Sequence, residues 1–113
     1  MVEVHPAANH AKPGEQIQLT CKTMTELQVP LSSQSHAVEW EFLSNGTNDR
    51  MGICYSNIVR SDLRGKYQCR TEAHKHTLMI SNVSVKDSGT YTCIEDEGRG
   101  PGVDSSLLMV YRE

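Results

Sequence analysis

Hydrophobic and polar residues alternate with a period of two in several short segments of the chain. The clearest segments are 17–21, 38–42, 78–80 and 91–93. This period places every second side chain on the same face, as a strand with one buried face requires. No segment carries a convincing helical period. The pattern therefore predicts strands and no long helix.

Turn-forming residues separate the alternating segments. They are Pro13-Gly14, Asn45-Gly46, the stretch 62–65, Asp87-Ser88-Gly89 and the stretch 98–102. Many short strands with frequent turns predict an all-β fold, either an antiparallel sandwich or a barrel. The 113 residues match the length of one domain, so we expect a single domain over 1–113.

Charge and hydropathy exclude several classes of partner. The chain has 14 acidic against 11 basic residues, a net charge of −3, whereas a nucleic-acid-binding surface needs a basic surplus. No apolar stretch approaches the length of a membrane span, and no signal peptide is present. We therefore expect an ectodomain fragment whose signal peptide, stalk, transmembrane segment and tail lie outside this chain.

Four cysteines indicate an oxidising environment. They are Cys21, Cys54, Cys69 and Cys93. None has the C-x-x-C spacing of zinc or redox sites, so two disulfides are the better interpretation, with three possible connectivities. The sequons at Asn45 and Asn82 predict glycosylation and agree with an extracellular location, on the cell surface or secreted.

Three sequence motifs together resemble the immunoglobulin superfamily. A strand-like segment ends in Cys21, Trp40 follows nineteen residues later, and 87–93 reads D-x-G-x-Y-x-C. The resemblance implies a Cys21–Cys93 disulfide between two sheets, with Trp40 packed on it. It also implies that Tyr91 forms the tyrosine corner beside Asp87.

The spacing of these motifs resembles the variable-type domain. The 72 residues from Cys21 to Cys93 leave room for two extra strands, giving the sheets that family notation writes ABED and GFCC′C″. Lys66 resembles the basic residue that begins strand D and would pair with Asp87. Cys54 on strand C′ and Cys69 on strand D would form a second disulfide, which resembles the T-cell costimulatory receptors.

Two departures distinguish the chain from related receptor classes. The proline-rich ligand motif that the costimulatory receptors carry in the FG loop is absent. Leu43 stands where antigen-receptor domains have the glutamine used in chain pairing, and Ser105 stands where they have glycine. An innate or costimulatory receptor is therefore favoured over an antibody or T-cell-receptor chain.

The outward residues of the GFCC′ sheet are the first candidate binding site. They are Glu39, Glu41, Leu43, Ile53, Tyr55, Thr92, Ile94, Leu107 and Met109. Six of these nine are apolar or aromatic and are expected to be adjacent, which is typical of a protein interface. The alternatives are that a one-residue shift in register turns half of them inward, or that the stalk covers them.

The FG loop is the second candidate. Its acidic run is Glu95-Asp96-Glu97, and Arg99 follows between glycines. Loops at the end of a sandwich often recognise ligands, and an acidic tip favours a basic partner surface. The alternative is a solvated acidic loop.

Catalytic and metal-binding motifs are missing from the sequence. His74 and His76 are two residues apart, but no further ligand is evident nearby, and we expect them in a solvated turn. No nucleophile elbow, H-E-x-x-H or phosphate-binding loop is present. We expect no enzyme activity, no cofactor, no metal and no small-molecule substrate.

The sequence thus predicts the ligand-recognition domain of an immune cell-surface receptor, which binds a protein partner through the GFCC′ face and the FG loop. Two alternatives remain. One is a homophilic adhesion domain that forms a homodimer, and the other is an antigen-receptor-like domain that pairs with another chain.

Overall fold

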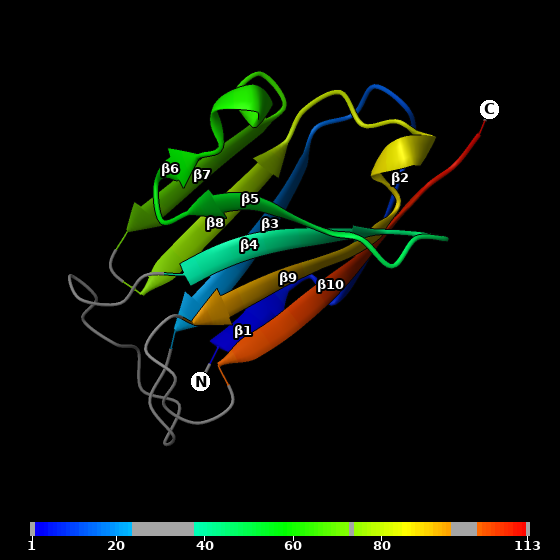
Figure 1. Ribbon diagram of the computed structural model, residues 1–113. Coiled ribbons are helices and arrows are strands. Elements are labelled where there is room, and N and C mark those ends of the chain that lie inside the picture. Colours follow the sequence, from blue (N-terminus) through cyan, green and yellow to red (C-terminus); the bar gives the residue numbers. More distant parts are fainter. Residues whose placement is uncertain (1, 24–37, 73, 96–101, 113) are drawn as a thin grey trace.

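Two β-sheets face each other in the computed structural model, which describes residues 2–23, 38–72, 74–95 and 102–112 (Figure 1). The first sheet contains, in spatial order, β1 (Val2–His5), β3 (Ile17–Thr23), β8 (Lys75–Ile80) and β7 (Tyr67–Glu72). The second contains β2 (Ala8–Ala11), β10 (Val103–Val110), β9 (Gly89–Glu95), β4 (Val38–Ser44), β5 (Arg50–Tyr55) and β6 (Ile58–Val59). Two 3-10 turns are η1 (Ser61–Leu63) and η2 (Val85–Asp87).

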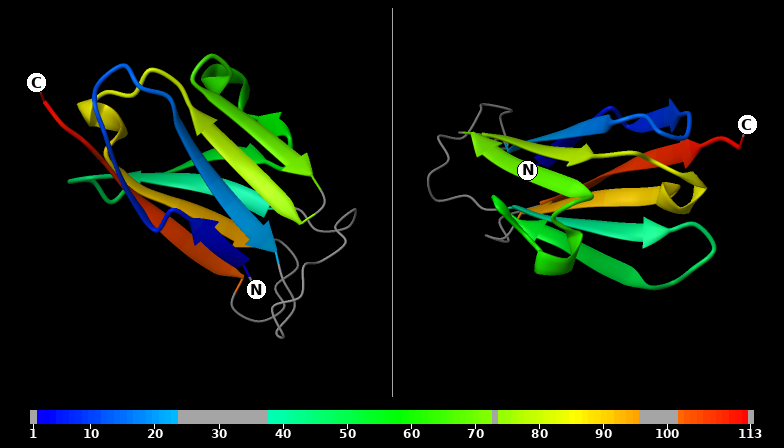
Figure 2. Two further views of the ribbon diagram at one scale, coloured as in Figure 1. Left: turned by 180° about the vertical axis from the view of Figure 1, so that it is seen from behind. Right: turned by 90° about the horizontal axis from the view of Figure 1, so that it is seen from above.

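The strand order confirms the predicted variable-type sandwich. The order β1-β3-β8-β7 is ABED, and β10-β9-β4-β5-β6 is GFCC′C″. Figure 2 shows the two layers from behind and from above. Among the described residues, no helix has the length and apolar character needed to cross a bilayer.

Strand β2 is an addition that the sequence pattern did not predict. After β1 the chain crosses from the first sheet to the second, where β2 pairs in parallel with β10 at the sheet edge. Pro6 separates β1 from β2 and lacks the N–H that a continuing ladder needs. Its carbonyl oxygen accepts a hydrogen bond from Ser106 Oγ at 2.6 Å, which ties the crossover to β10.

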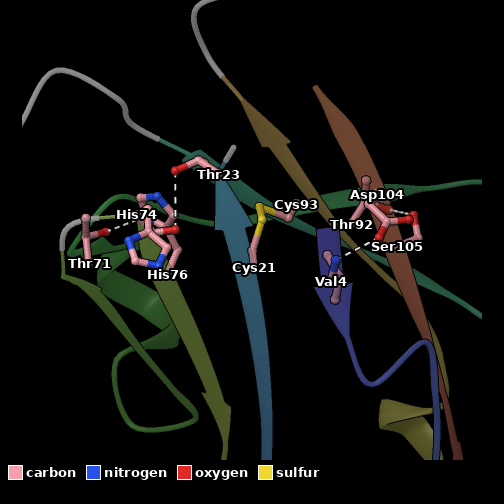
Figure 3. Close-up of a disulfide and its surroundings, with 10 residues drawn as sticks. All are labelled: Val4, Cys21, Thr23, Thr71, His74, His76, Thr92, Cys93, Asp104 and Ser105. Carbon is pink, nitrogen blue, oxygen red and sulfur yellow. Dashed lines mark hydrogen bonds between the residues drawn. A yellow bond between two sulfur atoms is a disulfide. The ribbon is translucent and has the colours of Figure 1, made fainter. Parts of the chain in front are cut away.

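The predicted inter-sheet disulfide is present. Cys21 on β3 is bonded to Cys93 on β9, and both are fully buried (Figure 3). Trp40 lies opposite Cys93 in the β4–β9 register and is 1 % exposed. Inward residues of both sheets surround the bridge, since each strand contributes every second side chain.

The second predicted disulfide is also confirmed. Cys54 on β5 is bonded to Cys69 on β7, so the bridge joins the two sheets near the β6 edge. The sequence separation is only 15 residues, against 72 for the first bridge. The bridge therefore joins β7, an edge strand of the first sheet, to β5, which lies next to the edge strand β6 of the second.

The tyrosine corner and its ion pair match the expectation. Tyr91 Oη donates to the Asp87 carbonyl oxygen at 2.8 Å. The Asp87 carboxylate accepts from Lys66 Nζ at 2.7 Å and from the Ser84 amide at 2.8 Å. Charge-assisted hydrogen bonds of this kind are stronger than neutral ones. These hydrogen bonds fix the position of η2, the turn that precedes β9.

Two buried tyrosines make the fold sensitive to alkaline pH. Burial raises the pKa of Tyr67 to about 12, with Asp87 adding to the shift, and burial likewise raises the pKa of Tyr91. A raised folded-state pKa gives stability that is complete below pH 10 and is lost as pH rises through the folded value.

We therefore expect stability to fall between about pH 10 and pH 12, by up to about 1.4 kcal/mol per pH unit for each tyrosine. Urea unfolding at a series of pH values measures this fall. The Tyr67→Phe variant should show a shallower decline over the same range, because only Tyr91 of this pair still titrates. An identical slope in both proteins would contradict the assignment.

A β-bulge overturns the prediction that Ile53 faces outward. Trp40 pairs with Cys54 whereas Glu41 pairs with Gly52, so Ile53 is an extra residue in β5. A bulge turns two consecutive side chains to the same face. Ile53 is consequently fully buried beside the buried Cys54, and it is removed from the candidate site.

The prediction of a solvated turn for the histidine pair is wrong for His76. Strand β8 begins at Lys75, and its alternation points His76 into the sandwich, where it is 1 % exposed. Its Nδ1 lies 3.0 Å from Thr71 Oγ1 (Figure 3). His74 is half-buried in the turn that precedes β8, and its carbonyl oxygen accepts a hydrogen bond from the Thr23 amide at 2.8 Å.

Candidate functional site

The outward side of β10, β9, β4 and β5 forms the candidate site, which we call the GFCC′ face. The strand registers arrange its residues in three rows across the sheet. The upper row is Val103, Ile94, Glu39 and Tyr55. The middle row is Ser105, Thr92, Glu41 and Gly52. The lower row is Leu107, Thr90, Leu43 and Arg50.

The upper row contains two exposed apolar or aromatic side chains, one on each of its outer strands. Val103 is 57 % exposed and Tyr55 is 45 % exposed, with the half-buried Ile94 and Glu39 between them. This row lies at the end of the sheet where β9 finishes and β10 begins. Large exposed apolar side chains in a row are unusual on a surface that contacts only water.

The predicted apolar residues are not all adjacent, because the middle row is polar. Thr92 Oγ1 and Ser105 Oγ are hydrogen-bonded at 2.9 Å (Figure 3). Ile94 and Leu43 lie four residues apart along the sheet, which is about 13 Å. Leu107 and Met109, 42 % and 37 % exposed, belong to the lower end with Leu43. The face therefore has two apolar groups instead of one patch.

A hollow of about 320 Å³ adjoins the upper row. It is lined by Glu39, Gly52, Ile53, Cys54, Tyr55, Ile58 and Arg60. Gly52 leaves this space because it has no side chain, and a Cβ there would make only ordinary contact with Glu39, at 3.6 Å. Both oxygens of Asp62 accept hydrogen bonds from Arg60, at 2.7 and 2.6 Å, which fixes the guanidinium beside the hollow.

Two glutamates give the face its predicted acidic character. Glu39 lies in the upper row and Glu41 in the middle row, and both are half-buried. Glu41 Oε1 is 3.6 Å from Arg50 Nη1, a surface ion pair of small energetic value. Glu39 lies directly between Ile94 and Tyr55 in the upper row.

The acidic-tip prediction is wrong for Glu95. Strand β9 continues to this residue, whose amide donates to the Gly102 carbonyl oxygen at 2.6 Å. Because Tyr91 and Cys93 point inward, alternation also turns Glu95 inward, and it is 5 % exposed. Asp96, Glu97 and Arg99, which the FG-loop prediction also names, lie outside the described residues.

Sequence reasoning missed two residues of the site. Val103 continues the outward alternation of Ser105 and Leu107, so extending that pattern by one step finds it. Ile58, 70 % exposed, lies in the two-residue strand β6 after a turn with Ser56 at φ 52°. Two residues carry no periodic signal, so the sequence offered no means of placing Ile58.

Comparison with known proteins gives one family match. The family model of the immunoglobulin V-set domain matches residues 4–105, which include both disulfides, Trp40 and the tyrosine corner. No curated protein matches the sequence closely.

Proposed function

Because the chain belongs to the immunoglobulin V-set domain family, we propose that it recognises a protein partner as the ligand-binding domain of an immune cell-surface receptor. Domains of this family typically bind other proteins, and the family is known for binding and not for catalysis. The proposed contact is the upper row of the GFCC′ face, continued by the FG loop. Its role is recognition without catalysis and without a cofactor.

The observation that carries this proposal is the combination of exposed side chains with the hollow. Val103 and Tyr55 stand on the two outer strands of the row, and Tyr55 also lines the hollow over Gly52. Binding energy concentrates where aromatic and apolar anchors lie beside a pocket that a partner side chain can fill. Glu39 within the row favours a partner with a basic group close to its apolar contact.

The position of Asn45 supports the choice of the upper row. Its Nδ2 atom, to which a glycan would be attached, lies 3.6 Å from Met109 Sδ. A glycan on Asn45 would cover the lower apolar group around Met109 and leave Val103 and Tyr55 accessible. The residue of the second sequon, Asn82, is exposed and follows β8, a strand of the first sheet, so a glycan there would be attached away from the GFCC′ face.

The two disulfides support an extracellular site of action. Disulfides form and persist in oxidising compartments, and both bridges here join the two sheets. We propose that the domain acts at the cell surface as part of a receptor.

A cell-surface protein screen with the tetramerised domain tests the proposal. We expect Val103→Glu to weaken binding of the identified partner by at least about tenfold, because a charge would be desolvated at the interface. Val85→Glu is the matched control, since Val85 is also an exposed valine, 37 % exposed, but lies in η2 away from the GFCC′ face. Its affinity should be unchanged.

Equal affinities of the two glutamate variants would contradict the proposed surface. Sedimentation of the isolated domain from low to high micromolar concentration separates the alternatives. A dimer that Val103→Glu abolishes and Val85→Glu keeps would assign the face to self-adhesion or chain pairing. A monomer throughout agrees with a receptor that binds a different protein.

A further inference from the structure

A groove of about 740 Å³ lies at one edge of the sandwich, lined by β7 and β8 of the first sheet and by Asn57, Ile58 and Val59 of the second. It runs along the outward side of β7 and β8 and is bordered by β6 and the turn before β7. Volumes of this size are typical of ligand sites. The groove is therefore large enough to hold a ligand.

Basic side chains dominate the charge of this groove. Arg64, Arg70 and Lys75 line it and are exposed, and Glu72 is the acidic residue among its lining side chains. The formal charge of the lining is therefore +2, whereas the whole chain carries −3. Glu72 Oε1 is 3.4 Å from Arg70 Nη1, both side chains being more than half exposed, so this pair is weak.

The three cations are spread along the strand direction. Lys75 pairs in register with Glu72 at the end of β7, Arg70 lies two residues before that end, and Arg64 precedes the strand. The five steps from Tyr67 to Glu72 alone span about 17 Å. This spacing suits a linear polyanion, whereas a single carboxylate or phosphate would need cations that converge on one point.

The uncharged polar lining is suited to a carbohydrate. Gln18 and Gln68 flank Met79 in register, and Thr77 lies opposite Arg70. Amides and hydroxyls both donate and accept hydrogen bonds, which matches the hydroxyl groups of a sugar.

The far wall of the groove is rigid. Asn57 Oδ1 accepts from the Thr71 amide at 2.7 Å, so the Asn57 amide has a fixed position on this wall. The Cys54–Cys69 disulfide joins β5 to β7 directly beneath this wall. A preformed groove loses little conformational entropy on binding.

We infer that this groove binds a sulfated glycosaminoglycan chain, with Arg64, Arg70 and Lys75 contacting sulfate groups and the amides contacting sugar hydroxyls. An acidic peptide also fits the charge, and the binding of polyglutamate tests that alternative. The three cations lie on or before β7 and β8, away from the proposed protein-binding row, and Ile58 of β6 is the residue that lines both the groove and the hollow beside that row.

Calorimetric titration with a size-defined heparin hexasaccharide tests the inference. We expect binding at physiological salt that weakens as salt is raised, because cation contacts release counterions. The variant Arg64→Gln/Arg70→Gln/Lys75→Gln should lose at least about tenfold in affinity. The control Lys12→Gln/Lys86→Gln/Arg112→Gln removes the same net charge from exposed positions outside the groove and should bind like the wild type.

Three results would overturn the inference. One is that the wild type does not bind the hexasaccharide at physiological salt. Another is an equal loss of affinity in both triple variants, which would show unspecific charge attraction. The third is tighter binding of polyglutamate or of desulfated heparin than of the sulfated probe. Each result can be obtained without knowing the protein partner, so failure here is distinguishable from failure of the proposed function.

Discussion

Replacing Gly89 with alanine is expected to destabilise the domain by at least about 4 kcal/mol, enough to prevent most of it from folding. Gly89 has φ 154° and is buried where β9 pairs with both β4 and β10. A Cβ at this position would overlap the Leu43 carbonyl oxygen and lie 2.8 Å from Phe42 Cε1. Backbone atoms of a central strand cannot move aside, so the clash adds to the strain of the positive φ.

Gly65→Ala is the matched control for this substitution. A Cβ on Gly65 meets nothing within 4 Å, so stability should change by less than about 1 kcal/mol. Circular dichroism and urea unfolding of the two variants measure the difference. A Gly89→Ala protein as stable as Gly65→Ala would contradict the close approach of β4 to β9.

Loss of the Cys21–Cys93 bridge is expected to have the second largest effect. The bridge closes 72 residues, which the chain-entropy model values at about 4 kcal/mol, against about 3 kcal/mol for the 15 residues of Cys54–Cys69. Both sulfurs of the first bridge are also in the fully buried core beside Trp40. Removing them leaves a cavity that adds a further packing cost.

Two double variants, Cys21→Ala/Cys93→Ala and Cys54→Ala/Cys69→Ala, measure this difference by urea unfolding. We expect the first to be the less stable and the second to remain folded, because Cys69 is only partly buried at the sheet edge. The opposite order would mean that the Cys54–Cys69 bridge, and not the core bridge, limits stability.

The sequence was sufficient for the fold because its signals act through strong steric and covalent constraints. Cys21, Trp40 and Cys93 lie together in the core as predicted, and Tyr91 bonds to Asp87 as predicted. The glycine of the D-x-G-x-Y-x-C motif also has a physical reason, since a Cβ on Gly89 would overlap the Leu43 carbonyl oxygen of the neighbouring strand. Each residue of these motifs is thus required by a covalent bond, a hydrogen bond or a close contact in the core.

The side chains that were wrongly predicted to face solvent lie at a bulge or near the end of a strand, where the sequence pattern does not show how far the strand extends. Ile53 turned inward because β5 contains a bulge, and Glu95 turned inward because β9 is one residue longer than the alternation suggested. His76 turned inward because β8 begins earlier than expected. Because the side-chain period is two, a one-residue bulge reverses the face that a side chain takes, and a longer strand turns every second added residue inward.

The groove and the hollow were not predictable because they depend on distant pairings. The groove joins Arg64 to Lys75 and Gln18 across three strands, and the hollow depends on Gly52 lying next to Glu39. Spacing within one segment contains no information on such neighbours. Only the strand order and register bring these residues together.

Nuclear magnetic resonance of the isotope-labelled domain, titrated with the partner from the screen, tests the central claim most directly. We expect resonance shifts to concentrate on β4, β5, β9 and β10, with the largest at Ile94, Val103 and Tyr55. Shifts concentrated on β3, β7 and β8, with the upper row unchanged, would contradict it.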